Sequence, residues 1–525
     1  MFARPDATWL SFAGLQVSPA LSFGNLRESA VDGELGGVAR YHTFMRSILC
    51  LLAVLAFAMP RAWAQVVLPE LGDSSARVLS PQMERKLGEA AMRDIRFNEP
   101  SFVDDPEINE YLNTLGEKLL SAIPGGRQDF EFFAIREPTI NAFAFPGGFV
   151  GVHTGLLTAA DSESEVASVL AHEITHVTQR HIARLFGAQQ QMQIPTMIAM
   201  VAAILAARSR PDLASGAAMA AQGVAIQGQL GYSRDFEREA DRIGFQTLEA
   251  AGFDVRAMPS FFEKLQRFTR ISDDGRAPGY LRSHPLTTDR VADAQNRAQN
   301  ARYRQHVDSL EFHLVRAKLK AETGEASGAV SYFKAALQDR RYANEPAARY
   351  GLTLALLRDR QFAEAKAALA NLSAGTPKAP MIDTLAVRVL QGAGESAAAF
   401  ARIKEAIALN PYYRPLIYLQ ISALLEANRH ADALIALREP VRLYPRDTSL
   451  LSMQAKTYAA LGKRLMQHKV QAEVYLLQGS LPAAVEQLQF AQSAGDGDFY
   501  EQSVVEARLK EVRARLAAET KSLRQ

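Results

Sequence analysis

The pattern of apolar and polar positions divides this 525-residue chain into regions of different character. An almost wholly apolar run covers residues 48–59, and residues 80–125 have the spacing of helices with charged flanks. Residues 130–135 and 142–152 instead have patterns typical of strands. Pro and Gly at 146–148 interrupt the second of these, which predicts an edge strand or a bulge, with a plain hairpin as the alternative.

From about residue 306 the pattern becomes helical and periodic. Three residue types recur 34 positions apart. The series are Ala329, Ala363, Ala397 and Ala431; Leu356, Leu390 and Leu424; and Pro377, Pro411 and Pro445. This is the period of tetratricopeptide repeats, in which small residues lie where paired helices cross. We therefore predict an all-α tetratricopeptide solenoid over residues 306–525.

The repeat pattern changes towards the end of the chain. Register is lost after Pro445, where residues 463–470 are interpreted as an inserted segment. The last stretch carries apolar residues on one helical face between charged ones. These residues are Val505, Leu509, Val512 and Leu516. One apolar face and one polar face are what a terminal repeat needs, so we predict a C-terminal capping helix.

Residues 45–64 have the pattern of a secretory signal peptide. A basic residue precedes the apolar run, and Ala62-Trp63-Ala64 has the form of a cleavage site. The apolar run is too short to cross a bilayer as a permanent helix. We predict a mature chain that begins at Gln65 and enters the periplasm. Residues 1–44 lack a period and are interpreted as a non-native or disordered extension; a genuine extension with an uncleaved anchor is the alternative.

Composition adds limits to this division. With 48% hydrophobic residues, the chain is long enough for two domains with cores of their own, predicted at residues 65–305 and 306–525. The net charge of +2 gives no reason to expect nucleic acid as a partner. The one cysteine, Cys50, lies inside the predicted signal, so a mature chain has no disulfide.

The sequence His172-Glu173-Ile174-Thr175-His176 carries the clearest chemistry. On a helix its two histidines point from one face and can bind one Zn²⁺, while Glu173 is placed to act on a water as general base. Ser162 and Glu165 form a capping box, which predicts a helix that begins near residue 161 and carries the motif in its middle. The alternative is a solvated helix with two unrelated histidines.

A catalytic zinc site needs a third protein ligand and keeps a fourth position for water. Glu237 and Asp241 are spaced four apart on one helical face, so Glu237 can bind the metal and Asp241 can orient a ligating histidine. Glu239 points about 200° away from Glu237 and is not expected as a ligand. Gln179 and Ile182 stand where the metzincin pattern needs glycine and histidine, which excludes that class.

Together these residues carry a family resemblance. The motif at 172–176 followed by Ser-Arg-x-x-Glu-x-x-Ala-Asp at 233–241 resembles peptidases of family M48, the Ste24/HtpX-type gluzincins. Residues 141–148, and Arg282-Ser283-His284-Pro285 with Arg290, match two further family segments. The resemblance covers about residues 80–295. It implies an α+β fold, in which a mainly helical metalloprotease domain with a small β-sheet precedes the solenoid.

The role of His284 stays open at this point. The resemblance places it in the site, where it can stabilise the oxyanion or occupy the fourth zinc position and hold the enzyme inactive. The alternative is a structural His-Pro turn. The other histidines, including His153 and His181, are interpreted as surface or turn residues.

The segments at residues 194–207 and 214–230 are rich in small and apolar residues. One interpretation is a pair of helices packed on the core. The other is a mobile lid that contacts either the substrate or a membrane surface. In the second case residues 194–230 would attach the protein peripherally to the membrane.

These observations predict a zinc-dependent endopeptidase with one Zn²⁺ per chain. The order of an exported M48-like domain and tetratricopeptide repeats resembles periplasmic proteases of outer-membrane β-barrel assembly. The resemblance implies a chaperone-like role in quality control and degradation of misassembled proteins. Its implied partners are unfolded or stalled β-barrel proteins and, through the repeats, the barrel-assembly machinery. The alternative is a chaperone or adaptor with a structural or latent metal site.

Overall fold

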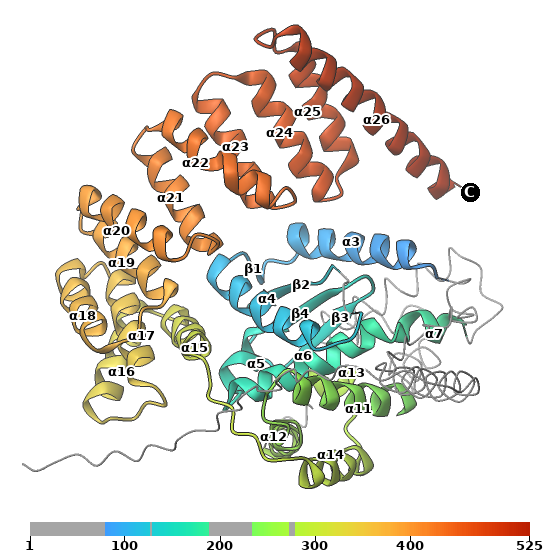
Figure 1. Ribbon diagram of the computed structural model, residues 1–525, viewed down its shortest axis with the longest axis vertical. Helices are drawn as coiled ribbons and strands as arrows, with labels where there is room; N and C mark the ends of the chain where they lie inside the picture. The colour runs from blue at the N-terminus through green and yellow to red at the C-terminus, as the bar shows by residue number, and fades with distance from the viewer. Residues whose placement is uncertain (1–78, 126–128, 188–233, 272–278, 525) are drawn as a thin grey trace, which may run out of the picture. The chain divides into compact units, whose positions relative to one another are not determined.

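The computed structural model describes residues 79–125, 129–187, 234–271 and 279–524 (Figure 1). The predicted signal at 45–64, the extension at 1–44 and the apolar segments at 194–207 and 214–230 lie outside these residues. Within the described ranges, no helix combines the length and the apolar character needed to cross a bilayer.

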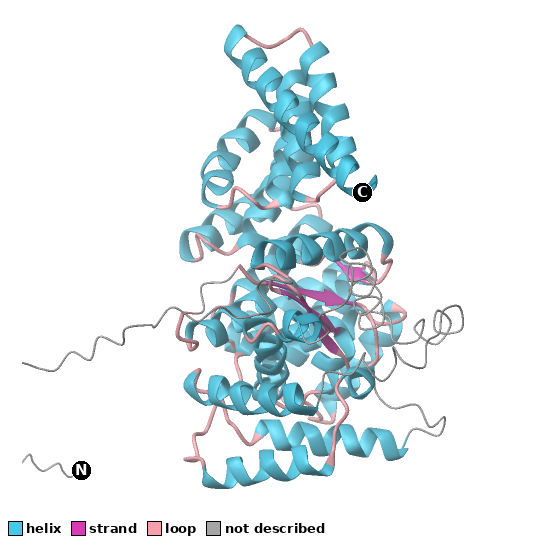
Figure 2. Cartoon of the chain, turned by 90° about the vertical axis from the view of Figure 1, so that its right-hand side faces the viewer, coloured by secondary structure: helices cyan, strands magenta, loops and turns pink. Residues whose placement is uncertain are grey.

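A four-stranded sheet lies in the N-terminal part of the described chain (Figure 2). Its strands are β1 (Phe102–Val103), β2 (Glu131–Ile135), β3 (Ala142–Phe145) and β4 (Phe149–His153), in the order β1-β2-β4-β3. Strands β2 and β4 run parallel, and the two outer pairs are antiparallel. Gly147 and Gly148 have positive φ and form the turn between β3 and β4. The prediction of one interrupted strand over 142–152 is therefore wrong, and the hairpin alternative is correct.

Both faces of this sheet are covered by helices, which explains why its strands are apolar on both sides. On one face Phe133 and Phe143 pack with Met92 of α3 (Pro81–Asn98). On the other face the core includes residues of α4 (Pro106–Ser121) and α6 (Glu163–Thr178). Strand β3 forms one edge of the sheet, as predicted.

The remaining helices before the repeat region are α5 (Thr154–Ala159), α7 (His181–Gly187), α11 (Arg234–Ala250), α12 (Ala257–Ile271), α13 (Gly279–Ser283) and α14 (Thr288–Asn300). Three of them pack on α6, which are α7, α11 and α12. Helix α11 approaches α6 closely because it has glycine at the crossing point. A Cβ atom on Gly244 would lie 3.2 Å from the backbone nitrogen of His172. This approach brings the acidic residues of α11 beside the His172–His176 motif.

The repeat region consists of helices α15 to α26. They are α15 (Leu310–Glu322), α16 (Ala326–Gln338), α17 (Glu345–Arg358), α18 (Phe362–Gly375), α19 (Pro380–Gly392), α20 (Ser396–Leu409), α21 (Arg414–Glu426), α22 (His430–Leu443), α23 (Thr448–Ala460), α24 (Arg464–Leu477), α25 (Leu481–Ser493) and α26 (Phe499–Arg524). The apolar core of the N-terminal part continues into it through α15, α17 and α19. The chain is thus mainly helical, with one small sheet and a helical repeat region, as predicted.

The backbone period of 34 residues continues beyond Pro445. Helices α18, α20, α22 and α24 start at residues 362, 396, 430 and 464. The predicted insertion at 463–470 is therefore wrong, since these residues begin α24 in register. Leu465 takes the position of the small residue of earlier repeats and is buried, so the side-chain pattern breaks while the backbone does not. In α26, the predicted capping helix, Val505, Leu509 and Val512 are buried.

Candidate active site

The His-Glu-x-x-His motif lies on α6, and local capping sets the start of this helix. Ser162 Oγ accepts the backbone N–H of Glu165 at 3.3 Å. The Glu165 carboxylate in turn accepts the backbone N–H of Asp161 at 2.8 Å. The helix begins at Glu163, close to the predicted start, but it ends at Thr178. The motif therefore lies in the C-terminal half of the helix rather than in its middle.

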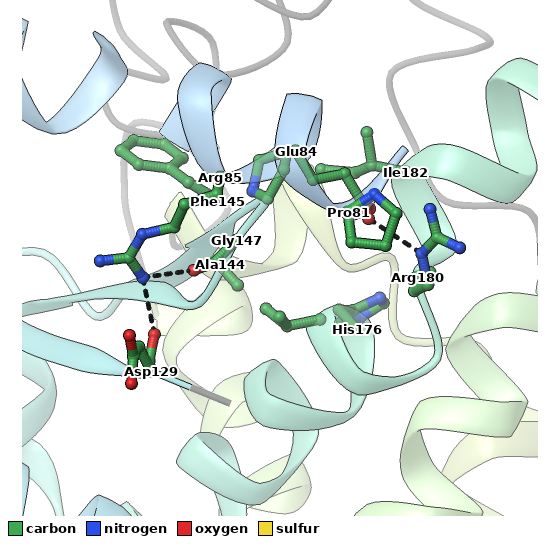
Figure 3. Close-up of a pocket in the computed structure, with 12 residues that line it drawn as sticks. Pro81, Glu84, Arg85, Asp129, Ala144, Phe145, Gly147, His176, Arg180 and Ile182 are labelled. Atoms are coloured by element: carbon green, nitrogen blue, oxygen red, sulfur yellow. Dashed lines mark hydrogen bonds and ion pairs between the residues drawn. The ribbon is translucent and has the colours of Figure 1, made fainter. Parts of the chain in front are cut away.

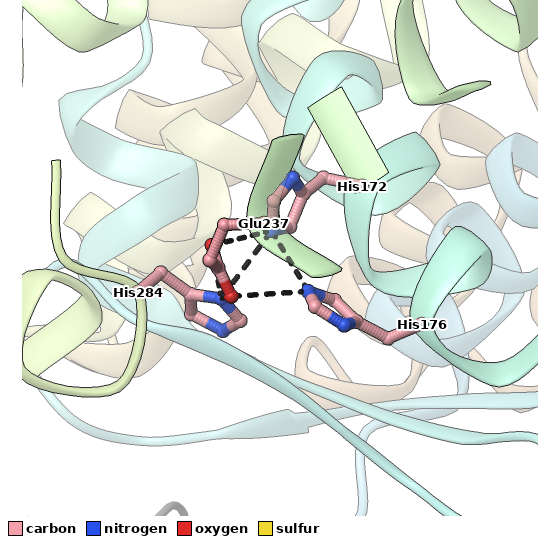
Figure 4. A group of neighbouring side chains, drawn as sticks. All are labelled: His172, His176, Glu237 and His284. Carbon is pink, nitrogen blue, oxygen red and sulfur yellow. Dashed lines mark hydrogen bonds and ion pairs between the residues drawn. The ribbon is translucent and has the colours of Figure 1, made fainter. Parts of the chain in front are cut away.

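Four buried side chains converge beside this motif. Figure 4 shows His172, His176, Glu237 and His284, each of which directs one ligand atom to a common point, and these atoms lie within 4.8 Å of one another. His172 Nε2 is 3.0 Å from His176 Nε2 and 3.3 Å from His284 Nδ1. A tetrahedron of Zn–N bonds has edges of about 3.3 Å. The donor types and their spacing therefore fit a zinc ion.

A buried ion-pair network supports this cluster. Arg290 makes two hydrogen bonds to the Asp241 carboxylate, at 2.7 and 2.8 Å, and approaches Glu237 at 2.9 Å. Asp241 Oδ1 also lies 3.0 Å from His172 Nδ1, on the ring edge opposite the ligand atom. The structure thus brings Asp241 to the position expected of a residue that orients His172. Sequence reasoning noted Arg290 as part of a segment but assigned it no contact.

These charges shift the titration of the site. Burial lowers the pKa of His172, but hydrogen bonds to Asp241 and Glu237 outweigh it and raise the pKa to about 9. Burial raises the pKa of Glu237, yet His284, His172 and Arg290 hold it well below its usual range. Glu237 is therefore an anion at neutral pH, which is the form that binds a cation.

Glu173 lies at the same cluster and is fully buried. Within the described residues its carboxylate oxygens accept no hydrogen bond. Nε2 of His284 lies 3.3 Å from Glu173 Oε1. The Tyr280 ring stacks on His284 with a centroid distance of 4.6 Å. The sequence gave no signal for the contact between Tyr280 and His284, because Tyr280 belongs to none of the recognised motifs.

Two histidines that were interpreted as surface or turn residues are buried, so that prediction is wrong. His153 ends strand β4, where its Nδ1 lies 2.9 Å from Thr139 Oγ1. His181 has no exposed surface, and its Nδ1 lies 2.8 Å from Nδ1 of His176. If α6 continued, His181 would lie about 140° round the helix from His176. The helix instead ends, and Arg180 has a positive φ of 52°, which turns the chain so that α7 folds back.

Glu239 lies outside the ligand cluster, on the side of α11 that faces α7. Its carboxylate is 3.3 Å from Nε2 of His181 and 2.9 Å from a guanidinium nitrogen of Arg184. The Phe236 ring stacks on His181 at 4.6 Å. Burial lowers the pKa of His181 to about 4 even though Glu239 favours its protonation, so the ring is neutral at pH 7.

A cavity of about 240 Å³ adjoins the cluster. Figure 3 shows it between α3, the β3–β4 turn and the end of α6. Ala144 and Phe145 of edge strand β3 line it, as do His176 and Val177 of α6. One wall of the cavity is therefore formed by a metal-ligand candidate and another by the sheet edge.

The comparisons with known proteins agree with this geometry. The model of "Peptidase family M48" matches residues 106–298. A relative from Vibrio cholerae is 39% identical over 336 residues, which are 62% of this chain and 68% of its own length. The β-barrel assembly-enhancing protease of Escherichia coli is 33% identical over 85% of this chain and 91% of its own length. The β-barrel assembly-enhancing protease of Yersinia pestis is 32% identical over 86% of this chain and 92% of its own length.

Proposed function

This chain belongs to peptidase family M48, and we propose that it is a zinc-dependent endopeptidase whose metal is held by His172, His176 and Glu237. The observation that carries the proposal is the convergence of these three ligand atoms next to the buried carboxylate of Glu173, which accepts no hydrogen bond from any described residue. When bound, Zn²⁺ supplies a Lewis acid that polarises the scissile carbonyl and lowers the pKa of a water. A structural site has no use for a general base at this position.

The protein's own groups account for the proton transfers. Glu173 takes a proton from the attacking water and passes it to the leaving amine. Its carboxylate can do this because no described donor holds its oxygens. Asp241 Oδ1 lies 3.0 Å from Nδ1 of His172, where a carboxylate keeps Nε2 of that ring directed to the ligand cluster. Arg290 keeps Asp241 and Glu237 ionised in a buried setting.

We propose that substrate binds as an extended peptide along β3. This strand is an edge of the sheet, and an extended peptide can pair with an edge by backbone hydrogen bonds. The cavity lined by Ala144, Phe145 and Val177 lies beside the same edge and His176. Its mainly apolar wall suits an apolar substrate side chain next to the scissile bond.

His284 supports a second candidate function, a chaperone or adaptor with a latent or structural site. Its Nδ1 lies 3.1 Å from Glu237 Oε1, which makes it the fourth member of the ligand set. Sites with four protein ligands are typically structural, because no position is left for water. An enzyme that is inactive until His284 leaves the site would combine the two functions, peptidase and chaperone. His284→Ala should then raise peptidase activity, whereas a purely structural site stays inactive.

The cellular role follows from the relatives rather than from the site. Two proteins that match most of this chain are named β-barrel assembly-enhancing proteases. We propose that this protein likewise acts in the periplasm on outer-membrane β-barrel proteins, assisting productive ones and degrading stalled ones. The repeat region, as a tetratricopeptide solenoid, offers a surface for these substrates and for the barrel-assembly machinery.

The test is a paired digestion by the mature chain from residue 65 and its Glu173→Gln variant. An unfolded β-barrel protein is the substrate, and Glu249→Gln, an exposed change on α11, is the matched control. We expect equal zinc content in all three proteins, cleavage by the unaltered and control proteins, and turnover reduced by at least about 100-fold in Glu173→Gln. Retained turnover in Glu173→Gln would remove this residue from the proposed role.

A further inference from the structure

The two histidines of the motif are supported differently by α11. The first, His172, has a direct carboxylate partner, because Asp241 lies 3.0 Å from its Nδ1. The second, His176, has another imidazole in that place, with His181 Nδ1 at 2.8 Å from its own Nδ1. His181 then contacts a carboxylate of the same helix α11, Glu239. Each histidine is thus connected to an acidic residue of α11, one directly and one through a second ring.

The directions of the hydrogen bonds in the second connection follow from the position of the ligand atom. Nε2 of His176 points into the ligand cluster, and an Nε2 that binds a metal leaves the ring proton on Nδ1. That N–H donates to Nδ1 of His181, which must be the unprotonated nitrogen of its ring. His181 therefore carries its own proton on Nε2, where it donates to Glu239 at 3.3 Å. One tautomer of each ring satisfies all three contacts.

The surroundings hold this arrangement in place. His181 is fully buried and stacked on Phe236 with an interplanar angle of 10°. Arg184 donates to Glu239 at 2.9 Å and lies over the same Phe236 ring. The acceptor at the end of the chain is therefore fixed by an ion pair, and the ring in the middle by stacking. Neither His181 nor Glu239 offers an atom to the ligand cluster.

We propose that His181 and Glu239 are positioning residues that hold His176 in its metal-binding orientation and tautomer. The inference rests on the proposed function, because it assumes that Nε2 of His176 binds zinc. Hydrogen bonds from ligating histidines to such partners fix the ring and increase the basicity of the ligand nitrogen. The stabilisation acts on metal affinity, so it can be measured without any peptidase assay.

The experiment compares zinc affinity, by competition with a chromophoric chelator, in the mature chain and four variants. His181→Phe keeps the stacked ring but removes both hydrogen bonds, and it should weaken zinc binding about 10- to 100-fold. His181→Asn places an amide oxygen near the position of Nδ1 but loses the contact with Glu239, so it should bind zinc more tightly than His181→Phe and about as tightly as Glu239→Leu. Glu239→Leu should weaken binding about fivefold. Glu249→Leu, an exposed change on the same helix, should have no effect.

Unfolding temperatures in excess chelator separate positioning from packing. We expect the metal-free unfolding temperature of His181→Asn, which loses the stacked ring, to be no higher than that of His181→Phe, while its zinc affinity is higher. Equal zinc affinity in His181→Phe and the unaltered protein would overturn this inference alone, as would an Asn variant as weak as the Phe variant. Absence of zinc binding by the unaltered protein would overturn the proposed function as well. If His181→Phe does not fold, the zinc affinity of Glu239→Leu is compared with that of Glu249→Leu, and equal affinities would overturn the inference.

Discussion

Two clusters of buried charged groups among the described residues can be compared, and of these two only one has the form of a metal site. In the first, His172, His176 and Glu237 direct their ligand atoms to one point. The second lies where α4 meets the repeat region. There the ammonium of Lys318, which is fully buried, lies 2.6 Å from Asp105 and also contacts Glu107. Thr384 of α19 donates a further hydrogen bond to Glu107.

The difference between them is the source of the positive charge. In the α4 cluster a lysine of the chain itself neutralises the carboxylates, so the cluster is complete without an ion. In the cluster on α6 the cation of the chain, Arg290, lies behind Glu237 and Asp241 and leaves their other side to the imidazoles. Buried carboxylates alone therefore do not indicate a metal site. What distinguishes the cluster on α6 is that three imidazoles and one carboxylate direct a ligand atom to a common point.

The largest effect on stability is expected from Lys318→Met. It leaves Asp105 and Glu107 without their cation in a buried setting, which should lower the free energy of unfolding by about 3 kcal/mol. Urea unfolding of the metal-loaded protein measures this, with Lys320→Met, an exposed change on the same helix, as control. Zinc affinity should not change. A loss of zinc in Lys318→Met would show that the two clusters are not independent.

Asp241→Ala should lower zinc affinity as well as stability, because it also removes a buried ion-pair partner of Arg290. Loss of the acceptor for His172 should weaken zinc binding about 10- to 100-fold, which corresponds to about 1.4 to 2.7 kcal/mol. Asp241→Asn retains an oxygen acceptor, so its zinc affinity should lie between that of the unaltered protein and that of Asp241→Ala. Chelator competition gives the affinities. Unchanged affinity in Asp241→Ala would mean that His172 is oriented by other contacts.

The smallest effect is expected from Asp105→Asn, and it should depend on pH. Burial raises the pKa of Asp105, but Lys318 outweighs it and the pKa is lowered overall. The charged carboxylate therefore stabilises the folded protein above its unfolded pKa of about 3.9, and this contribution is lost as pH falls through the folded value. Asparagine keeps the cap that accepts from Glu107 and Ile108.

We expect the variant to be less stable than the unaltered protein by about 1 kcal/mol at pH 7, and by less as pH falls from 4 to 3. Urea unfolding at several pH values measures the difference. A difference that stays constant over this range would show that the charge of Asp105 does not stabilise the fold.

Local patterns were sufficient for much of the site. The spacing of His172 and His176 and the capping box at Ser162 depend only on helix geometry, and so does the shared face of Glu237 and Asp241. The structure agrees with these local expectations because each concerns residues within about one helical turn. The prediction failed for His181, where the helix ends and a left-handed residue turns the chain.

What the sequence by itself determined is the helical motif, its acidic partner helix, the mainly helical class with a small sheet, and the 34-residue period. What only the tertiary structure decided is which distant groups meet. The pairing of Arg290 with Asp241, the stacking of Tyr280 on His284 and the burial of Lys318 against α4 join residues far apart in the chain. Periodicity reports which face of an element is buried, but it carries no information about which other element covers that face.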